Sequence, residues 1–364
     1  MRIKDITNYI EELAPLAYAE DFDNVGLLVG DYKTKVTGVL VTLDTLEQTI
    51  DEAIESGCNL IVSFHPIIFS GLKKLNGNNY VERTVLKAIK NNIAIYATHT
   101  ALDNSNHGVS AKMCEVLGLQ NTKVLIPKKG IIKKLTTYVP YAEANNLRQA
   151  LFNAGAGSIG NYDDCSFSVE GKGSYKANEN ANPTIGERGI IQFEEETCIS
   201  VTFESHLERK IIDALFSNHS YEEVAYEIIT LQNIHQNIGM GMVGDLQSDM
   251  NEKEFLTYIK SVFKTGCVRH SKLLDNTIRK VAVLGGSGSF AIKNAIKKKA
   301  DVYISADFKY HEFYKAEERI LLADIGHYES EQFTKNLLVD YLTKKFTNFA
   351  IILSEKSTNP IHYI

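Results

Sequence analysis

A histidine and a glutamate near the end of the chain are spaced so that both could bind one metal ion. The stretch Ile320–Phe333 begins as an apolar run typical of a strand, reaches Gly326, and continues with helical spacing. His327 and Glu331 are therefore expected at positions i and i+4 of a helix, with their Cβ atoms about 5–6 Å apart. Because zinc sites use three or four nitrogen, oxygen or sulfur ligands, other segments should supply the rest.

Other histidines and carboxylates follow expected strands elsewhere in the chain. The full candidate set is His65, His99, Asp103, Asp307, His311, His327 and Glu331. Each residue alone has an ordinary interpretation, since a histidine at a strand end can simply be hydrogen-bonded or exposed and Asp103 could cap a helix. Together, mixed imidazole and carboxylate ligands are what a divalent ion needs in a site that stays open to substrate. A carboxylate such as Glu331 could also bridge two ions.

Strands and helices alternate on both sides of the middle of the chain, which predicts a mostly parallel sheet covered on both faces. The expected strands include 36–43, 59–63, 93–97, 278–284 and 301–305, and the expected helices include 5–14, 46–56, 80–91, 108–117, 251–263, 290–299 and one that carries His311. Binding sites in such sheets form beyond the carboxyl ends of the strands, where the candidate ligands lie. The stretches 60–103 and 301–331 also resemble each other, either by chance or because two related halves close on one cleft.

The middle of the chain has a different pattern. Strands are expected at 133–139, 197–204 and 224–231, with helices at 142–153 and 206–216, and the order of elements is that of a ferredoxin-like unit. The stretch 154–190 is rich in Gly, Asn and Ser and is read as a turn-rich excursion or a mobile loop. We therefore predict an α/β fold in which residues 1–128 and 235–364 form one metal-binding domain and residues 129–234 form an inserted α+β domain.

Other kinds of chemistry have less support. The turn Gly285–Ser289 could offer backbone N–H groups to a phosphate or be a plain tight turn, and it matches neither the dinucleotide fingerprint nor a P-loop. No Gly-x-Ser-x-Gly elbow is present. The five cysteines are scattered without a Cys-x-x-Cys pair, which argues against a disulfide framework and a thiolate zinc site and favours a reducing compartment.

Composition narrows the class of protein and of partner. The 364 residues are 44% hydrophobic and 23% charged, which is ordinary for a globular protein of two or three domains. A net charge of −6 argues against nucleic acid as the main partner. The first residues lack the apolar segment of a signal peptide, and the longest apolar run is too short to span a membrane. We therefore expect a cytoplasmic protein that does not bind membranes.

Five short motifs resemble, in this order, those of the YbgI/YqfO-like family, whose members are known as GTP cyclohydrolase 1 type 2 homologues or dinuclear-metal-centre hexameric proteins. The motifs are Phe22-Asp23-Asn24-Val25-Gly26-Leu27, Ser63-Phe64-His65-Pro66, Thr98-His99-Thr100-Ala101-Leu102-Asp103, Gly285-Gly286-Ser287-Gly288 and Gly326-His327-Tyr328-Glu329-Ser330-Glu331. The resemblance runs nearly end to end. The middle segment is similar to the PII-like (CutA-like) insertion of the longer members.

The resemblance implies a toroidal homohexamer whose metal sites face an interior cavity. One ion, expected to be zinc, would take His65, Asp103 and Glu331, and a second would take His327 with a bridging Glu331. Family members usually carry a second histidine at the position of Phe64, and a phenyl ring cannot coordinate a metal. The second site would then be weak, empty or completed by another group, such as His99, His311 or water, so the expectation is one or two ions per chain.

Two functions of different classes follow from these residues. The first is a metal-dependent hydrolase acting on a small, nucleotide-like substrate, with a water molecule activated by the metal and His99 as an acid or base. The second is a non-catalytic metal-binding or regulatory assembly whose PII-like insertion binds a partner or a small ligand. The cyclohydrolase label of the family is carried as a suggestion from homology.

Overall fold

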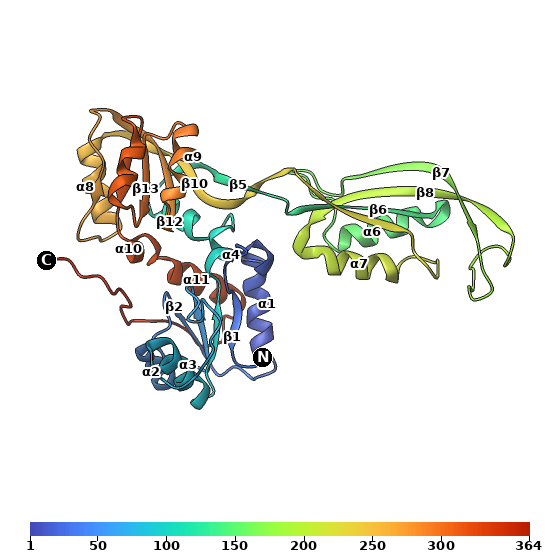
Figure 1. Cartoon of the computed structure of the whole chain (residues 1–364), viewed down its shortest axis with the longest axis horizontal. Coiled ribbons are helices and arrows are strands. Elements are labelled where there is room, and N and C mark those ends of the chain that lie inside the picture. Colours follow the sequence, from blue (N-terminus) through green and yellow to red (C-terminus); the bar gives the residue numbers. More distant parts are fainter. The chain divides into compact units, whose positions relative to one another are not determined.

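The computed structural model describes residues 1–364, which separate into two compact units. The first unit combines Met1–Pro127 with Asn237–Ile364, and the second comprises Lys128–Gln236. Figure 1 shows both units coloured along the sequence. No helix combines the length and the apolar character that crossing a membrane requires.

The first sheet of the first unit has five strands in the order β1-β4-β3-β2-β15. Their bounds are β1 (Gly26–Val29), β2 (Val39–Thr42), β3 (Leu60–Ser63), β4 (Ala94–Ala97) and β15 (Ile351–Leu353). Every residue of β2, β3 and β4 is buried, as expected of parallel strands covered on both faces. Strand β15 pairs in parallel with β2, so the beginning and the end of the chain share this sheet (Figure 1).

Helices cover both faces of this sheet. On one face, apolar side chains of α1 (Ile3–Leu13) and α11 (Thr334–Lys345) pack against Val41 and Val62. On the other face, α2 (Glu47–Glu55) and α3 (Tyr80–Lys90) pack against Leu40 and Ile61. The alternation of faces along each strand explains why both sets of helices find apolar partners.

The second sheet has six strands in the order β11-β14-β13-β12-β10-β5. Their bounds are β5 (Gln120–Lys129), β10 (Ile234–Asn251), β11 (Arg269–His270), β12 (Thr277–Ser287), β13 (Val302–Ala306) and β14 (Leu321–Asp324). Helices α5 (Val109–Val116) and α8 (Glu252–Val262) cover one face, and α9 (Ile292–Lys297) covers the other. The short helix α4 (His99–Asp103) follows β4, and the short helix α10 (His327–Glu331) follows β14. Two short 3-10 helices, η1 (Leu16–Tyr18) and η4 (Ser289–Ala291), lie elsewhere in this unit.

The two sheets share one arrangement of strands. In the first, β2, β3 and β4 are parallel neighbours and β1 pairs antiparallel with β4. In the second, β12, β13 and β14 are parallel neighbours and β11 pairs antiparallel with β14. This likeness agrees with the predicted resemblance between the halves. The expected helix around His311 is instead a 3-10 helix, η5 (Tyr310–Ala316).

The second unit is an inserted ferredoxin-like domain. Its elements are β6 (Ile132–Pro140), η2 (Tyr141–Glu143), α6 (Ala144–Asn153), β7 (Ser166–Lys176), β8 (Ile191–Glu204), η3 (Ser205–Leu207), α7 (Glu208–Ser217) and β9 (Tyr226–Leu231). The antiparallel sheet has the order β7-β8-β6-β9. Helices α6 and α7 pack on one face through Leu147, Leu151 and Ile211. The stretch 154–190 therefore contains a regular strand, β7, which pairs along its whole length with β8.

Candidate metal centre

The carboxyl ends of four parallel strands bring the candidate residues of the first unit together. His65 follows β3, and its backbone N–H donates to the carbonyl oxygen of Leu43 at 2.9 Å. His99 follows β4 and begins α4, Asp307 follows β13, and His327 begins α10 after β14. His99 and Asp307 both have positive φ, at 26° and 57°. A positive φ is unfavourable for residues with a side chain, and such strain gathers at functional sites.

Three ligand atoms converge at one point. One nitrogen from each of His65 and His327 and one oxygen of Glu331 all lie within 4.8 Å of one another. The Oε2 atom of Glu331 is 3.2 Å from Nε2 of His65 and 3.2 Å from Nε2 of His327. The spacing of four residues in α10 places His327 and Glu331 on the same side of that helix. His65 reaches them from the other half of the chain.

The unsatisfied oxygen of Glu331 provides a test of whether these residues fit a metal ion. The side chain of Glu331 is only 4% exposed, and its Oε2 atom is buried without a hydrogen-bond partner. A buried carboxylate oxygen without a partner is costly in a native structure. A divalent ion between Oε2 and the two Nε2 atoms would satisfy it with ligands that zinc and similar metals accept. The residues present therefore fit a bound divalent metal ion.

Each of the three histidines at the centre is held by its own aspartate. The Nδ1 atom of His65 is 2.7 Å from Asp44, that of His99 is 2.7 Å from Asp23, and that of His327 is 2.7 Å from Asp307. In the neutral ring, Nδ1 keeps its hydrogen and donates it in a hydrogen bond to the carboxylate, which leaves Nε2 as the electron-pair donor. Carboxylates of this kind orient metal-binding histidines and make their rings more basic.

Further hydrogen bonds fix these aspartates. Asp23 accepts from the backbone N–H of Thr100 at 3.0 Å as well as from His99. Burial alone would raise the pKa of Asp23, but these hydrogen bonds and the charge of His99 lower it to about 2. The hydrogen bond from His327, with another from Ser287 at 2.6 Å, lowers the pKa of Asp307 to about 2 despite partial burial. Both aspartates are therefore ionised near neutral pH and can act only as acceptors.

The metal-free centre carries protons on its imidazoles. Burial favours the neutral ring of His65, yet its hydrogen bond to Asp44 and the nearby negative charges of Glu331 and Asp44 raise its pKa to about 10. The pKa of His327 rises to about 11 for the same reasons, through Asp307 and Glu331. Burial would raise the pKa of Glu331 too, but the two imidazoles lower it to about 2. Without metal, the centre therefore contains two imidazolium ions around one carboxylate.

Metal uptake at neutral pH should therefore release protons. An ion needs the neutral Nε2 atoms of His65 and His327, whose pKa values of about 10 and 11 keep them protonated at pH 7 without metal. We expect about two protons to be released per ion, and an apparent affinity that rises with pH by up to about tenfold per pH unit for each proton released. Calorimetric titration of zinc into metal-free protein, in buffers of different ionisation enthalpy, measures this number. Binding without proton release would contradict the assignment.

The remaining predicted ligands lie in different positions. Asp103 ends α4 and is outside the convergent group of three. Burial of its carboxyl group and the nearby negative charge of Glu331 raise the pKa of Asp103 well above its usual value. Its role as a ligand stays a prediction. Asp307 holds the Nδ1 atom of His327 rather than pointing a free oxygen at the centre. His311 is exposed and packs against the rings of Tyr310 and Tyr314.

Two site residues were absent from the predicted set. Asp44 follows β2 and Asp23 precedes β1, and each holds a histidine of the centre. The sequence contained an indication of both residues. Asp44 is a polar residue that follows an expected strand, as His65 does, and Asp23 lies in the first of the five motifs.

Phe64 lies beside two imidazoles and is completely buried. Its ring centroid is 4.8 Å from that of His65 and 5.6 Å from that of His99, and its side chain belongs to the apolar core around Val41 and Val62. An imidazole in this place would be near the centre, whereas the phenyl ring offers only packing. The predicted second metal site therefore still lacks this ligand.

The glycine-rich turn after β12 makes room for Glu331. The backbone N–H of Gly286 donates to Oγ of Ser330 at 2.9 Å, so it is not offered to a phosphate. The φ of Gly286 is +66°, and a Cβ atom added there would lie 2.3 Å from Oε1 of Glu331. This hydrogen bond favours the tight-turn interpretation, and the absence of a side chain at Gly286 lets the carboxylate of Glu331 reach the centre.

Comparison with known proteins now identifies the family. The family described as Duf34/NIF3 (NGG1p interacting factor 3) matches residues 1–360. The chain belongs to this family. A Duf34/NIF3 relative from Bacillus subtilis, named GTP cyclohydrolase 1 type 2 homolog, is 38% identical over 371 residues, covering 99% of this chain and 98% of the relative. The crystal structure of a Bacillus cereus protein related to NIF3 is 36% identical, with a TM-score of 0.87, and covers 100% of this chain and 99% of that chain.

A more distant structure shows how far the fold of the Duf34/NIF3 family extends. A protein described as ybgI, of unknown function, is 14% identical and has a TM-score of 0.58, over 99% of this chain and 100% of that one. At this identity the likeness concerns the fold alone. The family and the fold that the five motifs implied are therefore confirmed.

Proposed function

We propose that this member of the Duf34/NIF3 family is a metal-dependent hydrolase acting on a small, nucleotide-like substrate. The observation that carries the proposal is the buried, unpartnered Oε2 atom of Glu331 between the Nε2 atoms of His65 and His327. These three residues would hold the ion, with Asp103 as the proposed further ligand. A bound divalent ion would lower the pKa of a water molecule and stabilise negative charge on a substrate oxygen. Imidazole and carboxylate ligands favour zinc.

His99 is the proposed acid or base. Its ring centroid is 5.4 Å from that of His65, and its side chain is 19% exposed, so a substrate at the centre can reach it. Asp23 accepts a hydrogen bond from Nδ1–H, which leaves Nε2 to take a proton from the reacting group or, once protonated, to return it. The names of the relatives make GTP and other nucleotides the first substrates to test.

Turnover assays test the proposal directly. Metal-loaded protein, purified without a histidine tag, is incubated with a panel of nucleotides and phosphoesters, and products are separated by chromatography. We expect release of a hydrolysis product that requires the added metal and is lost in His65→Ala. Binding of substrate without turnover across the panel would overturn the hydrolase proposal and favour a non-catalytic assembly.

Asp23→Asn separates a role in proton transfer from a role in metal binding. The amide cannot hold the Nδ1 proton of His99 as the carboxylate does, so the ring would lose its fixed tautomer and orientation. General acid or base catalysis is worth roughly 10²–10⁴-fold, so we expect turnover to fall by about 100-fold or more. Metal content, measured by mass spectrometry, should stay at the wild-type value. A parallel loss of metal would show that His99 is a ligand instead.

A second candidate function is a non-catalytic metal-binding or regulatory assembly. Phe64 favours it, because a phenyl ring cannot serve as the second ligand that the family resemblance implies at this position. Phe64→His tests this alternative. The new imidazole would lie beside His65 and His99, so the variant should bind more metal than the wild type, up to two ions per chain. A gain of metal together with a gain of turnover would indicate an enzyme lineage in which this chain lost its second site. Thermal unfolding serves as the control, since Phe64 is wholly buried.

The proposed assembly is a toroidal homohexamer with its metal centres facing an interior cavity. The support is the resemblance of the five motifs. Light scattering coupled to gel filtration should give six times the mass of one chain, and a monomer at micromolar concentration would contradict the proposal.

A further inference from the structure

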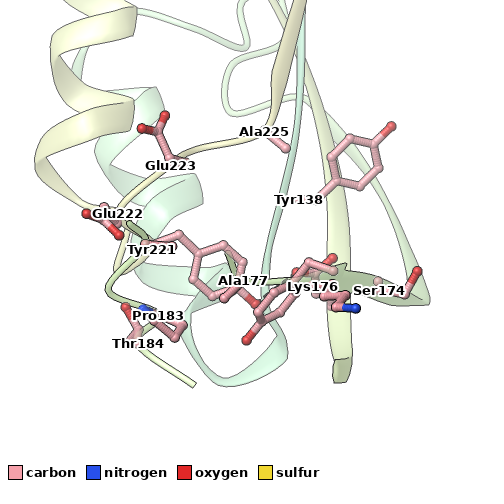
Figure 2. A pocket seen from close by; sticks show the side chains of 14 residues that line it. Tyr138, Ser174, Lys176, Ala177, Pro183, Thr184, Tyr221, Glu222, Glu223 and Ala225 are labelled. Carbon is pink, nitrogen blue, oxygen red and sulfur yellow. Dashed lines mark hydrogen bonds between the residues drawn. The ribbon is translucent and has the colours of Figure 1, made fainter. Parts of the chain in front are cut away.

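The inserted unit contains a pocket of its own, formed where β6, β7 and β8 meet the loops 177–184 and 221–225. Its volume is about 410 Å³, which is in the range of small-molecule sites. Three tyrosines, Tyr138, Tyr175 and Tyr221, contribute to the lining together with Ala177 and Pro183. Figure 2 shows Tyr221 and Pro183 on one side of this pocket and Tyr138 on the other. The surroundings are therefore largely aromatic and apolar.

The charge of the pocket is negative. Glu196, Glu222 and Glu223 contribute to its lining, against a single positive side chain, Lys176. The three carboxylates would repel a phosphate or another anion. They would attract a cation, most strongly where water is partly excluded.

Glu196 is the best-placed of these carboxylates. Its Oε1 atom accepts a hydrogen bond from the hydroxyl of Tyr221 at 2.8 Å, which fixes the side chain against an aromatic ring of the pocket. No hydrogen bond to its Oε2 atom is present, so that oxygen remains able to accept one from a ligand. The neighbouring Glu222 accepts through Oε2 from the backbone N–H of Asn182 at 2.7 Å, and this hydrogen bond holds the loop 177–184 in place.

A glycine in β7 makes room for this carboxylate. A Cβ atom at Gly173 would lie 2.1 Å from Oε2 of Glu196, so no side chain fits there without moving the carboxylate. The φ of Gly173 is not positive, and its backbone conformation is open to any residue. The same strand carries Gly171, where an added Cβ atom would meet nothing within 4 Å. A glycine at position 173 thus leaves space for the carboxylate of Glu196, whereas a glycine at position 171 has no such role.

We propose that this pocket binds a small organic cation, an ammonium compound with an apolar body. Aromatic rings attract such cations through their negative faces, and the half-buried carboxylate of Glu196, with an oxygen that accepts no hydrogen bond, completes the recognition. A metal ion needs several oxygen ligands close together and gains nothing from tyrosine rings, alanine and proline, whereas these side chains suit an organic body. The site is separate from the metal centre, so its occupancy does not depend on the proposed hydrolase activity.

Titration of the full chain with choline, spermidine and phenethylamine tests the proposal, with calorimetry and tyrosine fluorescence as readouts. For the choline comparison the matched probe is 3,3-dimethylbutanol, which has nearly the same shape without the charge. We expect at least one of the three cations to bind saturably at one site per chain. If choline binds, its affinity should be at least tenfold higher than that of 3,3-dimethylbutanol. Failure of all three cations to bind would overturn the proposal, and so would equal binding of a cation and its neutral analogue.

Gly173→Ala and Gly171→Ala form the matched pair of variants. Both add one methyl group to the same strand, but only the first displaces the carboxylate of Glu196. We expect Gly173→Ala and Glu196→Gln each to weaken binding of the amine at least tenfold, while Gly171→Ala and Glu331→Gln leave it unchanged. Circular dichroism and thermal unfolding verify that the variants fold. Equal binding by the two glycine variants would show that Glu196 does not recognise the cation and would contradict the proposal.

Discussion

Glu331→Gln is expected to abolish stoichiometric metal binding. The substitution keeps the shape of the side chain but replaces the buried, negatively charged oxygens between His65 and His327 by a neutral amide. Removing a partner that only orients a ligand typically weakens metal affinity by about 10–100-fold, and loss of a ligand should exceed that range. Mass spectrometry of protein purified without a histidine tag, and competition with a chromogenic chelator, measure metal content and affinity.

Glu329→Gln is the matched control for this experiment. Glu329 lies on the same short helix and is also buried, but it binds the side chain of Asn359 at 3.1 Å and is outside the convergent group. Both variants lose one negative charge from α10. Metal should be retained in Glu329→Gln and lost in Glu331→Gln. An equal loss of metal in both variants would make the charge of the helix responsible, and full retention in both would show that Glu331 is not needed. Either result would contradict the assignment of Glu331 as a ligand.

Gly286→Ala should have the second large effect, because it acts on Glu331 without altering any ligand. The added Cβ atom would lie 2.3 Å from Oε1 of Glu331 and 3.3 Å from the ring of His327. The carboxylate would have to move away from the two Nε2 atoms. We expect at least a tenfold loss of metal affinity, and a thermal midpoint that zinc no longer raises.

Gly118→Ala controls for the backbone cost of the same change. Gly118 has φ +65°, almost equal to the +66° of Gly286, but an added Cβ atom there would meet nothing within 4 Å. Both variants should lose about 1–2 kcal/mol of stability, since each places alanine in the left-handed region. Zinc should stabilise Gly118→Ala as it does the wild type. Equal stabilisation of Gly286→Ala by zinc would contradict the role assigned to this turn.

Local spacing and strand order predicted that His65, His327 and Glu331 come together, three of the seven candidate residues. The spacing of four residues from His327 to Glu331 places both on one side of a helix, and the strand ends after β3 and β14 bring His65 to them. Alternation of short apolar strands with helices likewise predicted the two-sided sheets. These features depend on periodicity and on the direction of parallel strands, which a single sequence contains.

The roles of individual carboxylates could not be predicted in the same way. Asp44 and Asp307 each follow a strand of the sheets, as a metal ligand would, but they bind the Nδ1 atoms of their histidines. Only a distance distinguishes an aspartate that binds an ion from one that orients a histidine. Strand β7 escaped prediction because Gly171 and Gly173 interrupt its pattern and most of its side chains are exposed, so burial provides no alternation to detect.

Diffraction from a zinc-soaked crystal, with anomalous data collected at the zinc absorption edge, tests the central claim most directly. The account predicts an anomalous peak within about 2.0–2.2 Å of Nε2 of His65, Nε2 of His327 and an oxygen of Glu331. A second peak near His99 would indicate a second ion despite Phe64. A protein that takes up zinc elsewhere, with no peak between these three residues, would contradict the account.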